Sequence, residues 1–393
     1  MKNIEKNENK NRRDFIKTGS AVAGLGLTVA CSSPKQMSSS SSAAPVRYRD
    51  LGSTGFKTSE IGFGCMNMRN PELLHAAIDS GINYIDTAHS YMNGVNEEVV
   101  GSVMKTKRDK VFLTTKIRGK ASELPGLITT SLNRLQTDHV DLVLLHVTDT
   151  RDQLFNGDIM RVFEMAKRKG QTRFIGVSTH SNQAEVLNAA VEGGFWEAVL
   201  TGYNYNSPPE LVTAIKGARQ AGIAIIGMKN LITTERPRKP FPDIRDGNTA
   251  ITNQQALLKW CLEDRYVDTL IPGITSFEQL ADDVAIMDMQ LTYDDNRIAR
   301  RYSEASKGVY CCGVSGCTGC KNKCPNGVNV NELNRCLNYA EGYKDMELAQ
   351  ENYAALPSSS QIGMCADCDE CAVKCVNGID LTANINRARN IFA

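Results

Sequence analysis

Short runs of apolar and β-branched residues alternate with longer amphipathic segments over most of this chain. Between residues 60 and 286, each predicted strand is followed by one predicted helix. The predicted strands cover residues 60–65, 84–86, 111–117, 140–146, 174–178, 198–203, 224–229 and 269–274. The predicted helices cover residues 71–80, 97–105, 124–135, 155–169, 183–191, 209–221, 253–263 and 277–286. These repeating units predict an α/β fold, a closed (β/α)8 barrel of parallel strands.

Two segments of the predicted barrel domain, residues 47–295, do not follow this alternation. Residues 46–59 are expected to form a small hairpin, because Gly52-Ser53-Thr54-Gly55 at their centre is typical of a turn. Residues 233–248 are rich in proline and charge. Such a composition predicts a long loop, which we expect over the face that carries the catalytic residues.

Residues 1–31 have the character of an export signal. Arg12-Arg13-Asp14-Phe15-Ile16-Lys17 precedes a weakly apolar run, an order that resembles a twin-arginine signal. Cys31 is followed by a serine-rich linker, residues 32–46, as in a lipoprotein tether, but Thr28 stands where an aliphatic residue is expected. Lipidation of Cys31 stays open, and so does a merely disordered basic terminus. The protein is expected to be periplasmic or lipid-anchored to the outer face of a bacterial membrane.

Composition narrows the partners. With 41% hydrophobic residues and a net charge of +1, the chain is an ordinary globular protein. Nucleic acid is not expected as the main partner, because proteins that bind phosphate backbones carry a basic face. The cysteines are unevenly distributed: of 13, ten lie between Cys311 and Cys375. Such clustering favours a metal-binding module over a disulfide scaffold.

The cysteine-rich tail, residues 296–393, contains an internal repeat. Three cysteines recur 51 residues later: Cys317, Cys320 and Cys324 as Cys368, Cys371 and Cys375. The run Cys365-x2-Cys368-x2-Cys371-x3-Cys375 has the spacing of a bacterial [4Fe–4S] ferredoxin, with Val376 in place of the usual proline. The first run has no cysteine at position 314, so Cys311 or Cys312 must supply its leading ligand.

Other chemistries are open for the tail. Cys312-x4-Cys317-x2-Cys320 also fits the plant-type [2Fe–2S] spacing, although the duplication and Cys324-Pro325 favour two [4Fe–4S] clusters. Zinc prefers paired Cys-x2-Cys knuckles, and disulfides are permitted outside the cytoplasm. A resemblance to two-cluster ferredoxins implies two ligand sets: Cys312, Cys317, Cys320 and Cys375 for one cluster, and Cys324, Cys365, Cys368 and Cys371 for the other.

Polar residues lie at the C-terminal ends of three adjacent predicted strands. In such a barrel these ends meet at one mouth. These residues are Asp86 and Tyr91 after the second strand, Lys116 on the third and His146 on the fourth. A carbonyl that accepts hydride develops negative charge on its oxygen and needs a proton donor. The Tyr91 phenol can donate that proton, and a nearby Lys116 ammonium is expected to lower its pKa.

The other two residues complete this chemistry. Asp86 would keep Lys116 in place and charged, and His146 would orient the carbonyl with a hydrogen bond. Taken alone, the aspartate is more simply explained as a helix cap, the lysine as a solvated side chain and the histidine as a surface group with its hydrogen bonds satisfied. The four together predict a catalytic site. His89 and His180 lie at the same face and are expected to line the substrate pocket.

The sequence around this site resembles the aldo-keto reductase family. The matching motifs, in family order, are Asp86–Tyr91 with Glu97-Glu98-Val99-Val100-Gly101, the segment Leu132–Leu142 running into His146, Ile175-Gly176-Val177-Ser178 and Ile271-Pro272-Gly273. They span residues 46 to 286. The resemblance implies that Tyr91 is the general acid, supported by Lys116, Asp86 and His146, and that the substrate is a small carbonyl compound.

The same resemblance implies NADP or NAD bound across the barrel mouth without a glycine-rich fingerprint. It puts Ser178 at the nicotinamide amide, Met228, Lys229 and Asn230 beside nicotinamide and pyrophosphate, and Gly273, Thr275 and Gln279 around the adenosine phosphate. Several residues depart from the family pattern. Leu200 replaces a glutamine, Met228 an aromatic residue, and Gly273 and Gln279 replace the Lys and Arg of many NADP users. The choice between NAD and NADP therefore stays open.

The sequence thus predicts an enzyme that reduces aldehydes or ketones with NAD(P)H, or oxidises the corresponding alcohols with NAD(P) in the reverse direction, and that carries two iron–sulfur clusters. The departures at the cofactor site support an alternative: an iron–sulfur electron-transfer or binding protein on a barrel that no longer turns over nicotinamide. In either case the clusters could serve a redox protein partner. A purely structural scaffold would leave the four polar residues at the barrel mouth unexplained.

Overall fold

The computed structural model describes residues 46–231, 251–306, 308, 311, 313, 317–342, 346–365, 368 and 370–393. The predicted export signal, the linker up to residue 45 and the predicted loop at 233–248 lie outside the described residues. Cys312 lies outside them as well.

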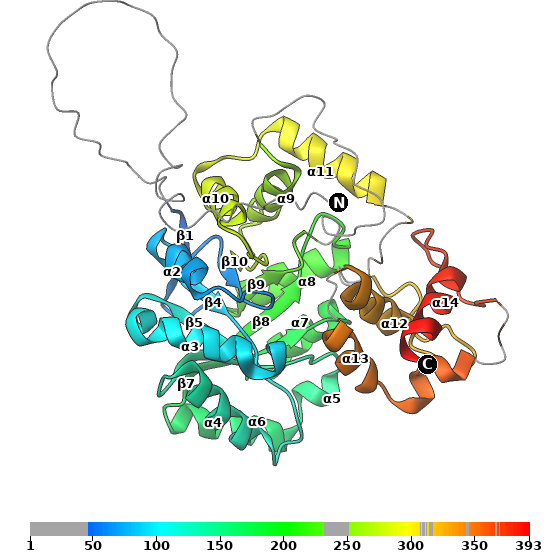
Figure 1. Ribbon diagram of the computed structural model, residues 1–393, viewed down its shortest axis with the longest axis horizontal. Coiled ribbons are helices and arrows are strands. Elements are labelled where there is room, and N and C mark those ends of the chain that lie inside the picture. Colours follow the sequence, from blue (N-terminus) through cyan, green and yellow to red (C-terminus); the bar gives the residue numbers. More distant parts are fainter. Residues whose placement is uncertain are drawn as a thin grey trace, which may run out of the picture.

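Eight parallel strands form the centre of the molecule (Figure 1). They are β3 (Phe63–Gly64), β4 (Tyr84–Asp86), β5 (Phe112–Ile117), β6 (Val140–Leu145), β7 (Thr172–Thr179), β8 (Ala198–Gly202), β9 (Ala224–Met228) and β10 (Thr269–Leu270). Neighbours in sequence are neighbours in the sheet, from β3 to β10. Parallel bridges between Ile61 and Leu270 and between Gly64 and Gly273 join the two edges. The predicted barrel is thereby confirmed.

Helices surround the strands and follow the predicted order. They are α2 (Pro71–Asp79), α3 (Val95–Lys107), α4 (Leu124–Leu135), α5 (Arg151–Leu154), α6 (Gly157–Arg168), α7 (Gln183–Gly193), α8 (Pro209–Gln220), α9 (Asn253–Leu262) and α10 (Phe277–Ala285), with short turns η1 (Tyr91–Gly94), η2 (Arg108–Lys110) and η3 (Ile286–Asp288). The single helix predicted at 155–169 is wrong at its start. Asn156 caps α6 by accepting hydrogen bonds from the backbone of Asp158 and Ile159, so the chain divides into α5 and α6.

Apolar side chains fill the barrel interior. Tyr84 and Phe112 stack with ring centroids 5.6 Å apart, and Phe112 stacks on Phe174 at 6.0 Å. Leu144, Leu200 and Ile226 belong to the same buried cluster. A packed interior leaves no channel through the barrel, so a small ligand can bind only at one of its two ends.

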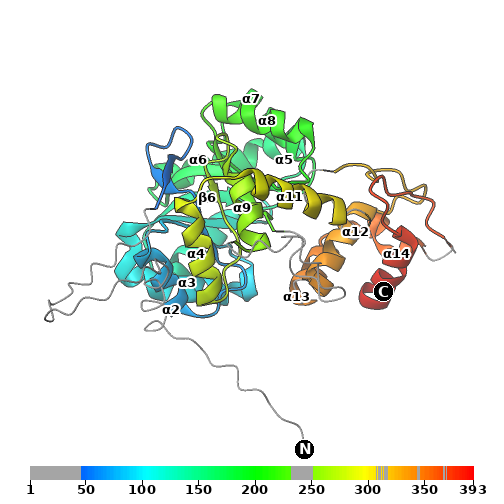
Figure 2. The same cartoon turned by 90° about the horizontal axis from the view of Figure 1, so that it is seen from above.

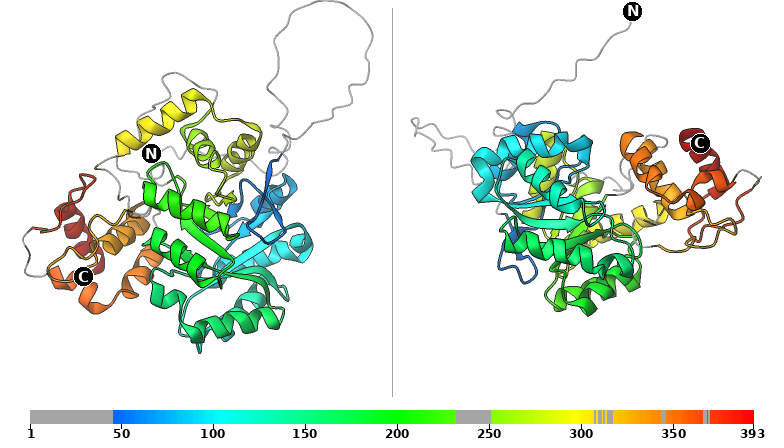
Figure 3. Two further views of the ribbon diagram at one scale, coloured as in Figure 1. Left: turned by 180° about the vertical axis from the view of Figure 1, so that it is seen from behind. Right: turned by 90° about the horizontal axis from the view of Figure 1, so that it is seen from below.

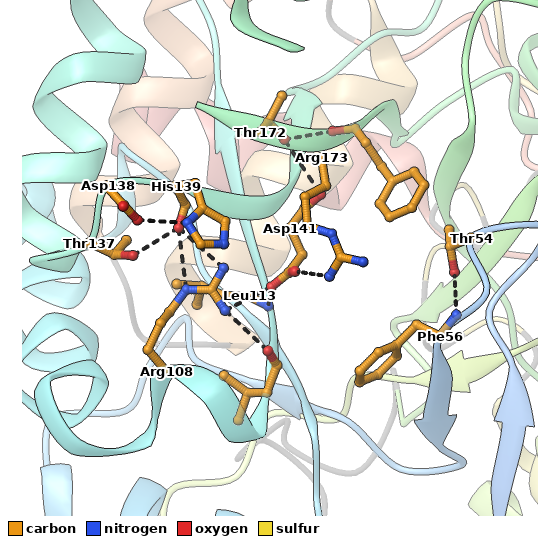
Figure 4. Close-up of polar contacts among 12 residues, drawn as sticks. Thr54, Phe56, Arg108, Leu113, Thr137, Asp138, His139, Asp141, Thr172 and Arg173 are labelled. Carbon is orange, nitrogen blue, oxygen red and sulfur yellow. Dashed lines mark hydrogen bonds and ion pairs between the residues drawn. The ribbon is translucent and has the colours of Figure 1, made fainter. Parts of the chain in front are cut away.

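The N-terminal ends of the strands are closed. The hairpin β1 (Tyr48–Asp50) and β2 (Lys57–Ser59) lies there, and Phe56 at its turn packs on Phe112 with centroids 5.1 Å apart. Figure 4 shows that buried Asp141 accepts bonds from Arg108, Arg173 and the Leu113 backbone, at 2.9, 2.8 and 2.8 Å. These contacts connect the loops at the N-terminal end of the barrel.

The last hundred residues form a helical tail. Helix α11 (Tyr293–Ser306) packs along α9. The tail then contains α12 (Val330–Leu337), the π-helical turn η5 (Asn338–Gly342), α13 (Met346–Ala354), the turns η6 (Ser358–Ser360) and η7 (Ile362–Cys365), and α14 (Leu381–Phe392). It has a small apolar core of its own. Figures 2 and 3 show it against one side of the barrel.

None of the helices within the described ranges has the length and apolar character needed to cross a bilayer.

Candidate active site

The structure brings the four predicted catalytic residues together at the C-terminal end of the barrel. Lys116 on β5 donates hydrogen bonds to Asp86 Oδ1 at 2.5 Å, to the Thr87 carbonyl at 2.8 Å and to the Tyr91 hydroxyl at 3.1 Å. Asp86 and Lys116 are each 2% exposed. The three donors of the ammonium therefore all have protein partners, and one of these is the predicted proton donor.

A left-handed turn aims Tyr91 at the lysine. Met92, Asn93 and Gly94 follow it with φ values of 52°, 53° and 92°. Only Gly94 adopts such a φ without steric cost, so the turn is strained at two positions. Asn96 holds it by accepting a bond from Thr87 Oγ1 and donating to the Cys65 carbonyl, both at 2.7 Å. Strain of this kind is typical of functional sites, where the surrounding structure enforces an unusual backbone.

His146 follows β6 and faces the phenol. Its ring and the ring of Tyr91 are 6.2 Å apart between centroids, in an edge-on arrangement. The next residue, Val147, has a φ of 60°, which is a genuine outlier for a β-branched side chain. The Val147 backbone N–H donates to Ser178 Oγ at 3.1 Å. Ser178 on β7 therefore supports the turn that orients His146.

Burial decides the charge states of the site. Burial raises the pKa of Tyr91, and the opposing effect of the Lys116 ammonium is smaller. Lys116 does lower the pKa of Tyr91 as predicted, but the loss of hydration on burial is the larger effect, so the pKa is raised overall. Burial alone would lower the pKa of Lys116, but Asp86 and Tyr91 outweigh it and the pKa is raised. Tyr91 is a phenol and Lys116 an ammonium at neutral pH.

His146 is a neutral imidazole for a related reason. Burial, followed by the nearby cations Lys116 and Arg118, holds its pKa well below the usual value near 6.5. A neutral imidazole carries a single N–H, so His146 can donate one hydrogen bond while its other nitrogen accepts.

The site opens on a cavity of about 180 Å³ with walls from both parts of the chain. The barrel contributes Met66, His89, Ser90, Tyr91, Lys116, Arg118, His146, Val147 and His180, and the tail contributes Tyr339, Leu348, Glu351 and Asn352. The two predicted pocket histidines do line this cavity. The tail residues were not foreseen from the sequence, because no periodicity relates them to barrel strands some 200 residues earlier.

Arg335 of α12 connects residues of the tail wall, the part of the cavity lining that the tail contributes. It forms a buried ion pair with Glu332 and donates to the Tyr339 hydroxyl at 3.2 Å and to Asn352 Oδ1 at 2.9 Å. Asn93, next to the Tyr91 turn, donates to Glu347 of α13. The wall is thus fixed to the barrel beside the candidate proton donor.

The residues assigned to nicotinamide by resemblance are found in and around the barrel end. Met228 and Leu200 belong to the barrel core. Lys229 Nζ lies 2.9 Å from His180 Nδ1. Asn230 donates to the Tyr203 carbonyl at 2.8 Å, and its buried Oδ1 has no hydrogen-bond partner among the described residues. An orphaned acceptor of this kind fits a polar ligand such as a carboxamide.

The residues assigned to the adenosine phosphate make contacts of a different kind. The backbone N–H and the hydroxyl of Thr275 donate to Gln279 Oε1 at 2.8 and 3.0 Å, at the N-terminus of α10. Gly273 pairs with Gly64 where the barrel closes. These contacts are structural: the first closes a turn before α10, and the second closes the barrel.

The tail cysteines gather in two sets, and each set combines the two repeats. Cys324 lines one small cavity with Cys365, Cys368 and Cys371. Burial and the neighbouring thiols, Cys324 foremost among them, raise the pKa of Cys365. Burial and the thiols of Cys317 and Cys375 raise the pKa of Cys320 to about 11. The fourth cysteine of each run therefore lies with the other run.

Amide groups point at several of these sulfurs. The Gly319 and Asn377 backbones donate to Cys317 Sγ and Cys375 Sγ, both at 3.4 Å. Side-chain amides of Asn377 and Asn326 donate to Cys317 Sγ at 3.5 Å and Cys368 Sγ at 3.3 Å. Amide donors stabilise thiolates and tune iron–sulfur clusters.

The described cysteines are free thiols, so disulfides do not explain their grouping. Within the described ranges, no three His, Cys, Asp or Glu side chains approach closely enough to hold a single metal ion. Cys311 Sγ lies 4.0 Å from Asn331 Oδ1, and Cys312 lies outside the described residues.

Comparison with known proteins bears on the barrel. Residues 60–234 match the aldo/keto reductase family. The oxidoreductase YqkF of Bacillus subtilis is 26% identical over 269 residues, which are 63% of this chain and 82% of that protein.

Solved structures agree with this match. An aldo-keto reductase from Klebsiella pneumoniae, in complex with NADPH, is 28% identical and superposes with a TM-score of 0.57 over 66% of this chain and 96% of its own. The aldo-keto reductase AKR11C1 from Bacillus halodurans is 25% identical, with a TM-score of 0.56 and the same coverage.

Proposed function

We propose that this chain is a member of the aldo/keto reductase family, whose model its residues 60–234 match, and that it reduces an aldehyde or ketone with NADPH or NADH. The observation that supports this most strongly is the buried chain from Asp86 through Lys116 to Tyr91, which ends at the cavity. The Klebsiella relative was solved with NADPH, so NADPH is the first nucleotide to test.

In this proposal each residue has one task. Bound nicotinamide supplies the hydride. Tyr91, protonated because its pKa is raised, gives its proton to the oxygen as negative charge develops there. Lys116 steadies the phenolate that remains, and Asp86 keeps the lysine charged. His146 donates its one N–H to the same oxygen and orients the carbonyl. Alcohol oxidation would run the same steps in reverse.

The test is stoichiometric oxidation of NADPH, and of NADH, with a panel of aldehydes and ketones. Tyr91→Phe should lower kcat by at least about 100-fold while nucleotide binding persists, because it removes only the proton donor. Tyr293→Phe on α11, where the side chain is 81% exposed, is the matched control and should behave as the wild type. Near-normal turnover by Tyr91→Phe would contradict the assignment. If no carbonyl compound supports the oxidation of NADPH or NADH, the alternative of a non-catalytic iron–sulfur protein is favoured.

We further propose two [4Fe–4S] clusters in the tail. One would be held by Cys324, Cys365, Cys368 and Cys371, and the other by Cys317, Cys320, Cys375 and either Cys311 or Cys312. The crossed cysteine sets and the amide groups directed at their sulfurs support this ligand assignment. Bound clusters would supply one-electron redox capacity and folding free energy. The visible spectrum and the iron and zinc contents of anaerobically purified protein test the proposal.

Export by a twin-arginine signal is also proposed, on the strength of Arg12-Arg13 and the apolar run after them. Fractionation of cells that express the full chain should recover it outside the cytoplasm, and Arg12→Lys with Arg13→Lys should retain it inside. Lipidation at Cys31 would tether the wild type to membranes, and Cys31→Ser would release it.

A further inference from the structure

A second histidine faces the cavity without a task in the proposed reaction. His180 follows β7, is 8% exposed and lines the cavity. Its ring centroid is 5.8 Å from that of His146, which is itself 6.2 Å from that of Tyr91. All three rings line the cavity, and the His146 ring is a neighbour of both others.

Lys229 fixes the orientation of His180. Its Nζ lies 2.9 Å from His180 Nδ1, and an ammonium can only donate. Nδ1 must then accept, so the imidazole proton resides on Nε2. Lys229 has a left-handed φ of 57°, and its carbonyl accepts a bond from Asn204 at 3.1 Å. A costly backbone conformation is maintained here, as is typical of functional positions.

The loop that carries His180 is fixed from its other side. Asp149 Oδ1 accepts bonds from the His180 and Ser181 backbones, at 2.7 and 3.0 Å. The imidazole is thus held through its own backbone and through Nδ1. Its remaining polar atom, Nε2, is buried and has no partner within the described residues. A buried donor without an acceptor is rare in proteins, and it indicates a ligand that supplies one.

We infer that His180 is a substrate-binding residue, whose Nε2–H donates to an oxygen on the carbon next to the reacting carbonyl. Lys229 is the residue that positions it. This inference rests on the proposed reductase function and names its substrate class: carbonyl compounds whose adjacent carbon carries a hydroxyl or is itself a carbonyl or carboxylate carbon. The placement of His146 next to both Tyr91 and His180 suits two neighbouring oxygens, the first near Tyr91 and His146 and the second near His180.

Matched substrate pairs test this class. Glycolaldehyde is compared with acetaldehyde, and 2-oxobutanoate with butanone, so that hydroxyl and carboxylate are assayed separately. For at least one pair, kcat/KM should be roughly 10- to 100-fold higher for the oxygenated member, because the other member leaves a buried donor unpaired. His180→Phe should bring this ratio close to one, and His180→Gln, which keeps a side-chain donor, should restore part of it. His139→Phe, at the closed end of the barrel, is the matched control and should keep the wild-type ratio (Figure 4).

The outcomes distinguish a failure of the inference about His180 from a failure of the proposed reductase function. If the wild type reduces both members of each pair equally well, the inference fails and the reductase function stands. If it reduces no carbonyl, both fail. If His180→Phe lowers activity on both members alike and weakens NADPH binding in a fluorescence titration, His180 serves the nucleotide and the inference is overturned.

The positioning role of Lys229 has a readout that does not depend on turnover. Protein labelled with 15N-histidine should show His180 as the Nε2–H tautomer. Lys229→Met should remove this preference and lower the substrate ratio, and Lys229→Arg, which keeps a charged donor, should retain both. An Nδ1–H tautomer in the wild type would overturn the assignment, because Nε2 would then have no proton to donate.

Discussion

Tyr91 and His146 owe their protonation states to desolvation more than to their charged neighbours. Lys116 donates a hydrogen bond to the phenol, yet the pKa of Tyr91 is raised, because the loss of hydration on burial is the larger effect. The same cause makes His146 neutral, and the cations around it act in the same direction. The proton of the phenol and the single N–H of the imidazole are thus both available at neutral pH, as the proposed reduction requires.

A pH dependence follows for His146. An ordinary histidine gains its proton near pH 6.5, whereas the pKa of His146 is held well below that value. As pH falls from 8 to 6, His146 should therefore stay neutral, and kcat for reduction should show no break near 6.5. The check is a kcat profile over that range, together with the ring resonances of His146 by NMR. A resonance that titrates with a midpoint near 6.5 would contradict the assigned neutral state.

Among the elements, the tail depends most on groups other than its apolar core. Helix α12 is buried on every face although half of its residues are polar. The apolar core of the tail is smaller than that of the barrel. Short modules with little apolar surface usually need metal ligation or disulfides to fold. The proposed clusters would add folding free energy to that of this core.

Single cysteine changes test this dependence. Cys368→Ser and Cys371→Ser should each lose roughly half of the iron, because both belong to one of two ligand sets, and should lower the unfolding temperature of the tail. Cys336→Ser is the control. Cys336 is buried but belongs to neither set, so this variant should keep its full iron content. Full iron in the first two variants, or zinc in place of iron, would contradict the ligand assignment.

At the scale of the full chain, the tail and the barrel share the candidate active site. Tyr339 and Asn352 line the cavity with the barrel residues, and Lys321, next to Cys320, donates to Asn182 Oδ1 at 2.5 Å. Asn182 lies two residues after His180. The proposed clusters would therefore brace the wall of the pocket, or serve a separate redox protein, without taking part in hydride transfer.

Electron counting supports that separation. Nicotinamide gives up two electrons as one hydride, whereas each cluster takes one electron at a time, and a flavin is the usual intermediary. We expect that anaerobic mixing with excess NADPH leaves the clusters unreduced in electron paramagnetic resonance spectra. Dithionite should reduce them in a parallel sample and so show that they are competent. Rapid reduction by NADPH without a flavin or mediator would make the tail part of the catalytic circuit.

Periodicity and motif spacing were sufficient to predict the barrel, because strand–helix alternation with short connections is compatible with few other topologies. They also foretold that Asp86, Lys116, Tyr91 and His146 meet, since parallel strands end at one face. Periodicity and motif spacing could predict neither the raised pKa of Tyr91 nor the part of the cavity wall that the tail forms. Desolvation depends on every neighbour of a group, and contacts such as that between Lys229 and His180 depend on how separate loops pack. These properties arise from the folded arrangement and leave no pattern in the sequence.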